Sequence, residues 1–255
     1  MINKWRQHRA LAEFAGHDRD SLLAVLAGTP RLLSRPWFQR AWLRWLLEAC
    51  PVADVFELIY AKNLWGTDES RSGAGSTLTE TASIRDALPG ILDQLAIRSL
   101  LDIPCGDFNW MRQVNLDGIE YIGADVVHDL VAANNMACGD SKRRFERLDV
   151  ISDRLPKMDA VLCRDCLVHL STEDGKRALA NIRDSGATYL LATTFPTVQK
   201  NVNILTGYWR PLNLTRPPFH LPAPLILVHE GNPDPLYAYK SLGVWRIADM
   251  EDDAS

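Results

Sequence analysis

The sequence lacks the features that would place it in several large classes of protein. It contains no run of about 18 consecutive apolar residues, which is the length that a membrane-spanning helix needs. Its first residues are polar and include no apolar signal region. The five cysteines are odd in number, and their spacing shows no disulfide framework. We therefore expect a reduced, cytoplasmic protein without a membrane span.

Positive charge is also scarce. Lys and Arg number 28 against 32 Asp and Glu, which gives a formal net charge of −4. No global basic field therefore attracts nucleic acid, and we disfavour nucleic acid as a substrate. The sequence has no Gly-x-x-x-x-Gly-Lys-Ser/Thr phosphate loop. It also lacks a Gly-x-Gly-x-x-Gly turn, which counts against an NAD-dependent enzyme.

What the sequence does contain is sufficient for a substantial core, because 47% of its 255 residues are hydrophobic. We expect residues 1–75 to form a helical extension that ends in a Gly/Ser-rich loop, and residues 76–250 to form the main domain. One helix of the extension carries an apolar stripe made of Phe38, Trp42, Trp45 and Leu46. The stripe packs against the main domain or, alternatively, contacts a membrane surface or a partner.

From residue 97 onward, strand-like runs alternate with helical runs. Such alternation predicts a doubly wound, mostly parallel α/β sheet with right-handed crossovers. A helix that begins near Thr79 precedes it, and Pro89-Gly90 should end or kink that helix. The seven expected strands are 98–103, 120–124, 144–148, 158–163, 188–193, 225–230 and 237–247, the last of them antiparallel. The helices expected between them are 108–115, 128–137 and 173–185.

The turn after the first expected strand has the chemistry of a nucleotide-binding turn. Asp102 ends the strand, and Gly106 lets a ligand approach the backbone closely. Asp125 ends the second strand, 19 residues beyond Gly106, where a carboxylate can accept hydrogen bonds from ribose hydroxyls. These residues predict a nucleotide site at the carboxyl ends of the strands.

The segment Leu100-Leu-Asp-Ile-Pro-Cys-Gly106 resembles the first motif of class I S-adenosylmethionine (SAM)-dependent methyltransferases, in a form with one glycine. Asp125 resembles the ribose-binding acid of that family, Asp149 the residue that contacts the adenine amine, and 159–169 the fourth-strand motif. Four motifs in the family's order make the resemblance specific. The residues that we assign to the cofactor are Trp65, Ser72, Gly73, Asp102, Pro104, Cys105, Gly106, Asp107, Asp125, Val126, Asp149, Val150 and Arg164.

The resemblance implies a class I methyltransferase fold, SAM as the cofactor and S-adenosylhomocysteine as the product. The expected activity is methyl transfer to an oxygen or nitrogen atom of a small molecule or glycan precursor. Two other functions stay open: a SAM-binding enzyme with different chemistry, and a non-catalytic binding subunit of this fold. The turn can also belong to another Rossmann-like domain.

The Gly/Ser-rich loop around Gly73 precedes the main domain. Its successive backbone amides can form an anion-binding nest for the carboxylate of the methionine part of SAM. Arg71 can add a charged donor, and Trp65 can close over the cofactor. The alternative is a flexible linker. The large aromatic side chain of Trp65 weighs against that alternative, because it normally needs something to pack on.

The segment Cys163-Arg-Asp-Cys-Leu-Val-His169 follows the fourth expected strand, where reactive groups are expected. Methyl transfer from a sulfonium needs an aligned nucleophile and a base that removes its proton. His169 is the candidate base, Asp165 is an alternative base or orients the substrate, and Arg164 can hold an anionic group. His169 can instead be a structural residue. Cys163 and Cys166 have a spacing that also occurs in zinc and redox sites, but we predict no metal site because only three ligands cluster.

The Pro-rich segment 196–224 follows the fifth expected strand. In the methyltransferases that the chain resembles, insertions at this place commonly line the acceptor site. A long loop in a compact domain is usually functional, although a surface excursion pinned by its prolines and by a buried Trp209 is the alternative. Its polar and aromatic side chains suit a hydroxylated or glycosidic ligand: Asn201, Asn203, Tyr208, Trp209, Arg210 and Asn213. Of these we assign Tyr208, Trp209 and Arg210 to the acceptor.

Overall fold

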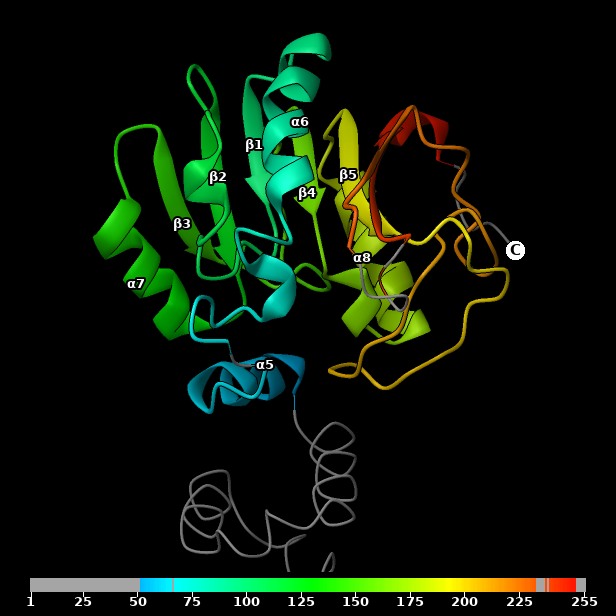
Figure 1. Ribbon diagram of the computed structural model, residues 1–255, viewed down its shortest axis with the longest axis horizontal. Coiled ribbons are helices and arrows are strands. Elements are labelled where there is room, and N and C mark those ends of the chain that lie inside the picture. The colour runs from blue at the N-terminus through cyan, green and yellow to red at the C-terminus, as the bar shows by residue number, and fades with distance from the viewer. Residues whose placement is uncertain (1–50, 66, 233–236, 238, 251–255) are drawn as a thin grey trace, which may run out of the picture. The chain divides into compact units, whose positions relative to one another are not determined.

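The computed structural model describes residues 51–65, 67–232, 237 and 239–250 of the chain. The central sheet and the helices around it belong to one unit that begins at Phe56 (Figure 1). The apolar stripe predicted at 38–46, and every helix expected before residue 51, lie outside the described residues.

A seven-stranded sheet organises this unit. Its strands are β1 (Ser99–Asp102), β2 (Glu120–Asp125), β3 (Arg143–Arg147), β4 (Ala160–Cys163), β5 (Tyr189–Thr194), β6 (Ile226–His229) and β7 (Ser241–Arg246). They lie in the order β3-β2-β1-β4-β5-β7-β6. Strands β1 to β5 pair in parallel, and β7 pairs antiparallel with both β5 and β6. The structure confirms the predicted α/β class, the mostly parallel sheet and the antiparallel last strand.

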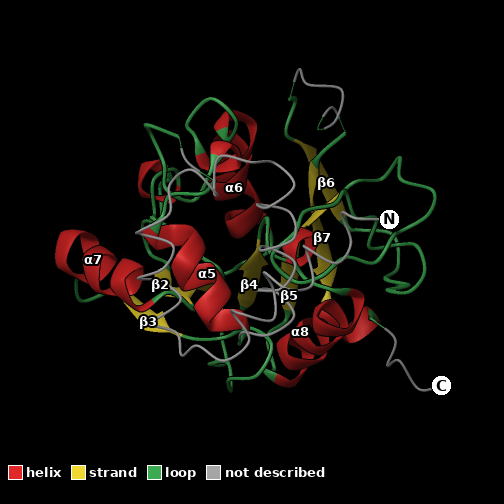
Figure 2. Ribbon diagram, turned by 90° about the horizontal axis from the view of Figure 1, so that it is seen from below, coloured by secondary structure: helices red, strands yellow, loops and turns green. Residues whose placement is uncertain are grey.

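The helices are α5 (Val52–Ala61), α6 (Ala82–Gln94), α7 (His128–Cys138) and α8 (Thr172–Asp184). Figure 2 shows α6 and α8 on opposite sides of the sheet. Leu88 of α6 and Leu130 of α7 belong to the same buried cluster as Leu100 and Leu162 of the central strands. Because β1 and β4 are buried on both faces, their sequences are almost continuously apolar.

The structure corrects two expectations about helices: Pro89-Gly90 does not end the helix that contains it, and residues 108–115 are not a helix. Helix α6 continues through Pro89 to Gln94, although proline supplies no amide hydrogen for a helical bond. Burial of Leu88 and Ile91 in the core holds the helix together across the proline.

The predicted helix 108–115 is a loop followed by one short 3₁₀ turn, Met111–Gln113. Phe108 has a φ of +57°, which is incompatible with a right-handed helix. Its ring lies against Tyr121 and Phe145, with centroids 5.3 and 5.1 Å away. Packing of one aromatic ring therefore overrides the apolar pattern of this segment.

The strand order places a switch point between β1 and β4. After β1 the chain continues to β2, on one side of the β1–β4 pair. After β4 it continues to β5, on the other side, so the loops that follow β1 and β4 lead in opposite directions. Ligands of open α/β sheets bind at such a point, outside the carboxyl ends of the strands. Because β7 runs in the opposite direction, its first residues lie at the same edge as the carboxyl ends of β1 and β4.

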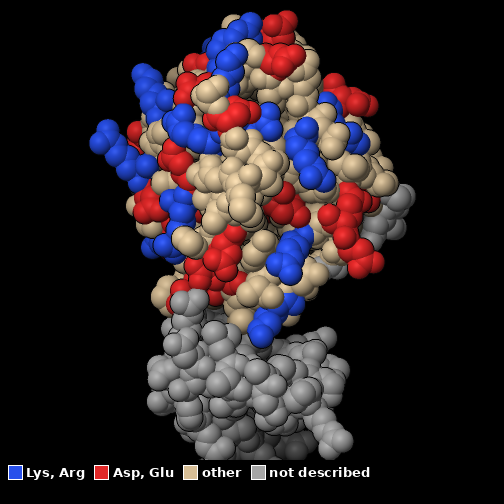
Figure 3. All heavy atoms as spheres, turned by 90° about the vertical axis from the view of Figure 1, so that its left-hand side faces the viewer, with Lys and Arg blue, Asp and Glu red and all other residues tan. Residues whose placement is uncertain are grey.

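The face that carries β3 and α7 has mixed charge, with basic and acidic side chains interspersed (Figure 3). Arg144 pairs there with Glu120 at 2.9 Å and with Glu146 at 2.8 Å. Charged side chains of this kind protect an exposed strand edge from pairing with another chain. None of the helices in the described part of the chain is long and apolar enough to cross a membrane.

Candidate functional site

The turn that follows β1 is built around Gly106. Gly106 has a φ of +55°, a left-handed conformation that favours glycine. Its amide donates a hydrogen bond to Oδ2 of Asp125 at 3.2 Å, and its carbonyl accepts one from Asn134 at 2.8 Å. Pro104 and Cys105 lie in the same turn, and the amide of Cys105 donates to the carbonyl of Ala124 at 2.8 Å. The structure thus brings the ends of β1 and β2 together.

Two buried carboxyl groups mark this edge of the sheet. Asp102 accepts a hydrogen bond from the Tyr121 hydroxyl at 2.6 Å, and Oδ1 of Asp125 accepts one from the amide of Val127 at 3.0 Å. Burial raises the pKa of Asp102 to about 7 and the pKa of Asp125 to about 6. Val126 lies half-buried beside Asp125. Both carboxyl groups therefore titrate close to neutral pH.

The Gly/Ser-rich loop is bonded directly to the turn after β1. The carboxylate of Asp107 accepts hydrogen bonds from the Ser70 hydroxyl at 3.0 Å, from the Arg71 amide at 2.8 Å and from the Ser72 hydroxyl at 3.2 Å. In return, the Ser72 hydroxyl accepts a bond from the amide of Asp107 at 2.8 Å. The loop is therefore a fixed cover of the turn, and the Asp107 carboxylate binds this cover.

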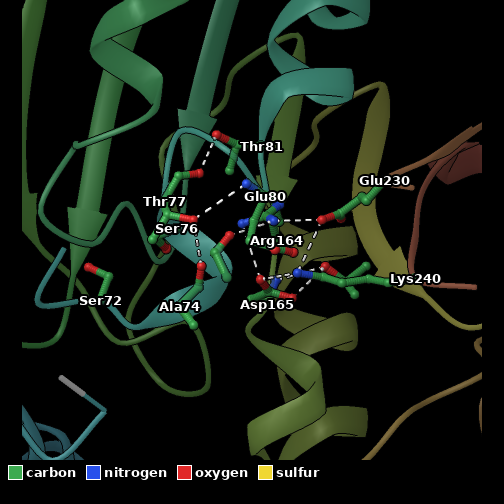
Figure 4. Close-up of polar contacts among 12 residues, drawn as sticks. Ser72, Ala74, Ser76, Thr77, Glu80, Thr81, Arg164, Asp165, Glu230 and Lys240 are labelled. Carbon is green, nitrogen blue, oxygen red and sulfur yellow. Dashed lines mark hydrogen bonds and ion pairs between the residues drawn. The ribbon is translucent and has the colours of Figure 1, made fainter. Parts of the chain in front are cut away.

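A cluster of four buried or half-buried charges fixes the other end of the loop (Figure 4). Arg164, just after β4, donates to the carbonyl of Gly75 at 2.8 Å and to Glu230 at 2.6 Å, and pairs with Asp165 at 3.1 Å. Lys240, just before β7, contacts Asp165 at 2.5 Å and Glu230 at 3.2 Å. Two positive and two negative charges balance within the cluster. The guanidinium of Arg164 is thus engaged by protein groups.

The cluster controls the protonation of Asp165. Burial acts to raise the pKa of Asp165, but the charges of Arg164 and Lys240 outweigh it and hold that pKa at about 2. Asp165 also accepts a bond from the Thr193 hydroxyl at 3.3 Å, and its amide donates to that oxygen at 2.8 Å. An ionised, paired carboxylate of low pKa is a weak base at neutral pH. The arrangement favours an orienting role for Asp165.

His169 has one ring nitrogen committed and the other available. Nδ1 lies 2.9 Å from the carbonyl oxygen of Tyr208. Because a carbonyl only accepts hydrogen bonds, Nδ1 carries the proton and Nε2 keeps its lone pair. Burial lowers the pKa of His169, so the ring is neutral at pH 7. Trp65 stacks on this ring with centroids 4.6 Å apart, and the backbone of Gly73 lies close to Trp65.

Asp149 lies just after β3, at the same edge of the sheet. Its carboxylate accepts bonds from the amide of Ile151 at 2.8 Å and from the hydroxyl of Ser152 at 3.0 Å, and Val150 beside it is buried. These bonds shape the local turn. Contact between Asp149 and an adenine amine stays a prediction.

The segment 196–224 has no regular secondary structure, and two of its asparagines hold it together. Asn201 donates to the carbonyls of Asn213 and Pro217 at 2.9 and 2.8 Å, and Asn213 donates to the carbonyl of Val198 at 2.9 Å. Asn203 accepts a bond from the amide of Thr172 at 2.8 Å, at the start of α8. All three asparagines are therefore structural in this state.

The remaining polar and aromatic residues of the segment lie closer to His169. Tyr208 supplies the carbonyl that His169 contacts. Trp209 is half-buried against Phe195 and Tyr237, with centroids 6.0 and 5.1 Å away. Arg210 is buried, and its burial lowers the pKa of its guanidinium to about 10. Cys163 and Cys166, in the strand and turn that lead to His169, are buried free cysteines.

Comparison with known proteins identifies the fold. No family model and no curated protein matches the sequence. Among solved structures, 1,6-didemethyltoxoflavin-N1-methyltransferase from Burkholderia thailandensis, with 1,6-didemethyltoxoflavin and S-adenosylhomocysteine bound, is similar over 76% of this chain and 86% of that one. The TM-score is 0.53 and the sequence identity 18%. The chain has the class I methyltransferase fold.

Weaker similarity extends to other structures. Human N-acetylserotonin methyltransferase in complex with SAM matches 85% of this chain and 68% of its own, at 12% identity and a TM-score of 0.46. Magnesium protoporphyrin IX methyltransferase from Synechocystis PCC 6803, with S-adenosylhomocysteine bound, matches 58% and 72%, at 15% identity and a TM-score of 0.41.

Within this methyltransferase fold, the sequence did not predict Glu230 or Lys240. Each is a charged residue that directly flanks a short apolar strand, β6 or β7, at the edge where the site lies. This position next to a strand could have identified Glu230 and Lys240 as site residues from the sequence, because an antiparallel β7 brings both of them to that edge. Asp107, which we assigned to the cofactor, is bonded to the covering loop in this structure, and its contact with a cofactor stays a prediction.

Stability should depend on pH through the buried carboxyl group at the end of β1. The pKa of Asp102 is about 7 in the folded protein, against an ordinary value of 3.8. From about pH 4 to pH 7 the folded state therefore holds more protons than the unfolded chain, and the free energy of unfolding falls as pH rises. Three pKa units correspond to about 4 kcal/mol. Urea unfolding at about pH 4.5 and pH 7.5 measures this loss.

The Asp102→Asn variant is the matched control, because the amide oxygen still accepts the bond from Tyr121 and cannot titrate. Its stability should change less than that of the wild type between the two pH values, and the change that remains belongs to Asp125, whose pKa is about 6 in the folded protein. An equal loss in the wild type and in this variant would assign the pH dependence to other groups. Asp165 affects the free energy of unfolding in a different pH range. Because its pKa is about 2 in the folded protein, its stabilising contribution is lost only as pH falls below about 4.

Replacing Gly106 with alanine should displace the covering loop. A Cβ atom at this position would lie 2.3 Å from the Ser72 hydroxyl oxygen and 3.0 Å from its Cβ, in addition to the strain of a positive φ. We expect a loss of about 3 kcal/mol in the free energy of unfolding. Gly118→Ala separates the two effects, because Gly118 has a φ of +78° with nothing within 4 Å of the added atom. That control should lose only about 1 kcal/mol. Equal losses in the two variants would show that Ser72 does not press on the turn.

Proposed function

We propose that this chain is a SAM-dependent methyltransferase that acts on an oxygen or nitrogen atom of a small molecule or glycan precursor. The observation that supports the proposal most is the path of the loop 65–75. Its Trp65 stacks on His169, the candidate base, and its Ser72 bonds to the turn that carries Gly106. One segment thus joins the turn expected to hold a cofactor to the residue expected to remove a proton.

The residues present fit the chemistry of SAM. Asp125 lies beside the glycine turn with a carboxylate whose oxygens have lone pairs left for the two ribose hydroxyls. Asp149, which follows the neighbouring strand β3, is the residue that we assign to the adenine amine. Gly73, with a φ of +99°, opens the loop 73–76, whose backbone suits the methionine carboxylate.

The mechanism that we infer assigns one proton transfer to the chain. SAM supplies an electrophilic methyl group bound to a sulfonium. His169 would take the proton of the acceptor at Nε2, and bound SAM would supply the methyl group and keep the electron pair of the carbon–sulfur bond on sulfur. Trp65 holds the imidazole ring by stacking, and Asp165 would orient the substrate.

Calorimetry with SAM and with S-adenosylhomocysteine tests the cofactor assignment. Both should bind, and NAD should not. Absence of binding by both SAM and S-adenosylhomocysteine would refute the proposal. Incubation with methyl-labelled SAM and a small-molecule extract then tests the reaction, and the label should appear in a small-molecule or glycan product. Consumption of SAM without transfer of the label would favour a different chemistry, and binding without turnover would favour a non-catalytic subunit.

A further inference from the structure

Arg210 is a buried cation that has no anionic partner in the part of the chain that the structure describes. It is 2% exposed, and its Nη1 donates only to the carbonyl oxygens of Leu167 and Val168, at 3.1 and 3.2 Å. Among the described residues, Nε and Nη2 have no hydrogen-bond partner. Arg164, buried to a similar extent, contacts two carboxylates instead. Because a guanidinium keeps its proton in proteins, Arg210 is a full charge removed from water without compensation.

The hydrogen bonds that Arg210 does make are not needed to satisfy the backbone. The carbonyl of Leu167 also accepts from the amide of Leu170 at 3.3 Å, and the carbonyl of Val168 accepts from the amide of Arg210 itself at 3.1 Å. A neutral side chain of similar size would leave both carbonyls with a partner. The local structure therefore does not require the charge, and an unsatisfied buried group of this kind calls for a functional explanation.

The free donors of Arg210 form the edge of the guanidinium that binds oxyanions best. Nε–H and Nη2–H lie side by side and point in the same direction, so together they match two oxygens of one carboxylate or phosphate. Nη1, which is already bonded, lies on the opposite edge. The two adjacent donors Nε–H and Nη2–H are therefore both free to bind one oxyanion.

Arg210 also lies next to the candidate base. The segment 207–210 is fastened to the turn after β4 by the bond from the Gly207 amide to the His169 carbonyl, at 2.7 Å. The bond from His169 Nδ1 to the Tyr208 carbonyl, at 2.9 Å, fastens it a second time. The guanidinium itself donates to the carbonyls of Leu167 and Val168, the two residues that precede His169. An acidic group of the acceptor that is held by Arg210 would therefore lie in the neighbourhood of His169, the residue proposed to take the proton of the acceptor.

We propose that Arg210 binds an oxyanion, a carboxylate or a phosphate, on the methyl acceptor, and that the acceptor is therefore an anionic small molecule. The inference rests on the proposed function, because it assigns the acceptor of that same site. Nε and Nη2 are closed to solvent in this structure, so the proposal requires that the Arg210 side chain or its surroundings move to admit the anion. In an environment screened from water, the resulting pair is stronger than the same pair at the surface.

The test uses the Arg210→Met variant and the matched Arg216→Met variant, whose arginine is exposed in the same segment. Without ligand, Arg210→Met should melt about 2–6 °C higher than the wild type, because an uncompensated buried charge is removed. Arg216→Met should leave the melting temperature unchanged. A lower melting temperature in Arg210→Met would mean that the cation is structural, and would overturn the inference.

The second arm measures ligand binding on the protein loaded with S-adenosylhomocysteine. The probes are acetate, benzoate and inorganic phosphate, with benzamide as the neutral counterpart of benzoate. At least one oxyanion should raise the melting temperature of the wild type and of Arg216→Met, and none should raise that of Arg210→Met. A response to benzoate alone identifies a carboxylate, and a response to phosphate alone a phosphate. An equal response to benzamide, or no response to any oxyanion, overturns the inference.

Calorimetry on the same preparations separates this inference from the proposed function. S-adenosylhomocysteine should bind the wild type and Arg210→Met with affinities within about twofold of each other, because Arg210 acts on the acceptor. If the product binds and no oxyanion does, the inference fails and the proposed function stands. If the product does not bind, the proposed function fails, and the assignment of Arg210 to an acceptor fails with it.

Discussion

Replacing His169 with alanine should lower the proposed rate of methyl transfer about 1,000-fold, which is the effect expected for loss of a general base. The physical reason is the state of its ring. Nδ1 is held by the Tyr208 carbonyl, and burial keeps the imidazole neutral, so Nε2 is an acceptor across the range in which the enzyme would work. The rate is measured in a single turnover with labelled SAM, using the acceptor that takes the label. Calorimetry should show an unchanged affinity for S-adenosylhomocysteine.

Two controls accompany this measurement. His169→Gln keeps a side-chain donor that can reach the Tyr208 carbonyl but has no base, so it should be as slow as the alanine variant. His128→Ala removes an exposed histidine beside Asp129 and should have the wild-type rate. A normal rate in His169→Gln would show that the ring only supports the local structure, and that the proton leaves by another path.

The second large effect concerns Asp125. Asp125→Asn should bind SAM about 50-fold more weakly than the wild type, because hydrogen bonds to a charged acceptor contribute about 1.5–3 kcal/mol each. The amide oxygen of asparagine can still accept one of the two backbone bonds that the carboxylate accepts now, from Gly106 and Val127. Asp129→Asn, at an exposed position in α7, should bind normally. Equal affinities of wild type and Asp125→Asn would refute the assignment of this carboxylate to the ribose.

The same carboxylate predicts a pH dependence of binding. Burial raises the pKa of Asp125 to about 6. Below that pH the carboxyl is protonated and accepts hydrogen bonds less well, so the affinity for SAM should fall as pH drops from about 7 to 5. In Asp125→Asn the affinity should stay constant over this range. A fall of the same size in both proteins would trace the pH dependence to another group.

Several features of the site follow directly from the sequence. Strands β1 and β2 are short, largely apolar runs that end at Asp102 and Asp125, so the edge that carries these two residues could be located without a structure. The spacing from Gly106 to Asp125 corresponds to a hydrogen bond between them in the folded chain. His169 could be assigned to the same edge because it follows the end of β4 by only a few residues, and so short a segment cannot carry it far from the strand.

Other features depend on contacts that local sequence does not encode. Arg164 and Glu230 lie 66 residues apart and meet because β7 and β6 add to the far side of β5. The left-handed conformation of Phe108, which prevents a helix at 108–115, depends on rings contributed by β2 and β3. The missing counter-ion of Arg210 can be recognised only when every neighbour is known. Whether a charged side chain meets an oppositely charged partner from a distant segment, as Arg164 does and Arg210 does not within the described residues, is decided by the tertiary structure.

The docking of the loop 67–76 also determines the order in which the site can be completed. The loop precedes β1 in the chain, so it leaves the ribosome before the strands that it later covers. Its two anchors, Asp107 after β1 and Arg164 after β4, are synthesised later, and the second of them is about 90 residues downstream. The first part of the site to be made can therefore be anchored at both ends only after Arg164 has been made and the pairing of β1 with β4 has brought both anchors to one edge of the sheet.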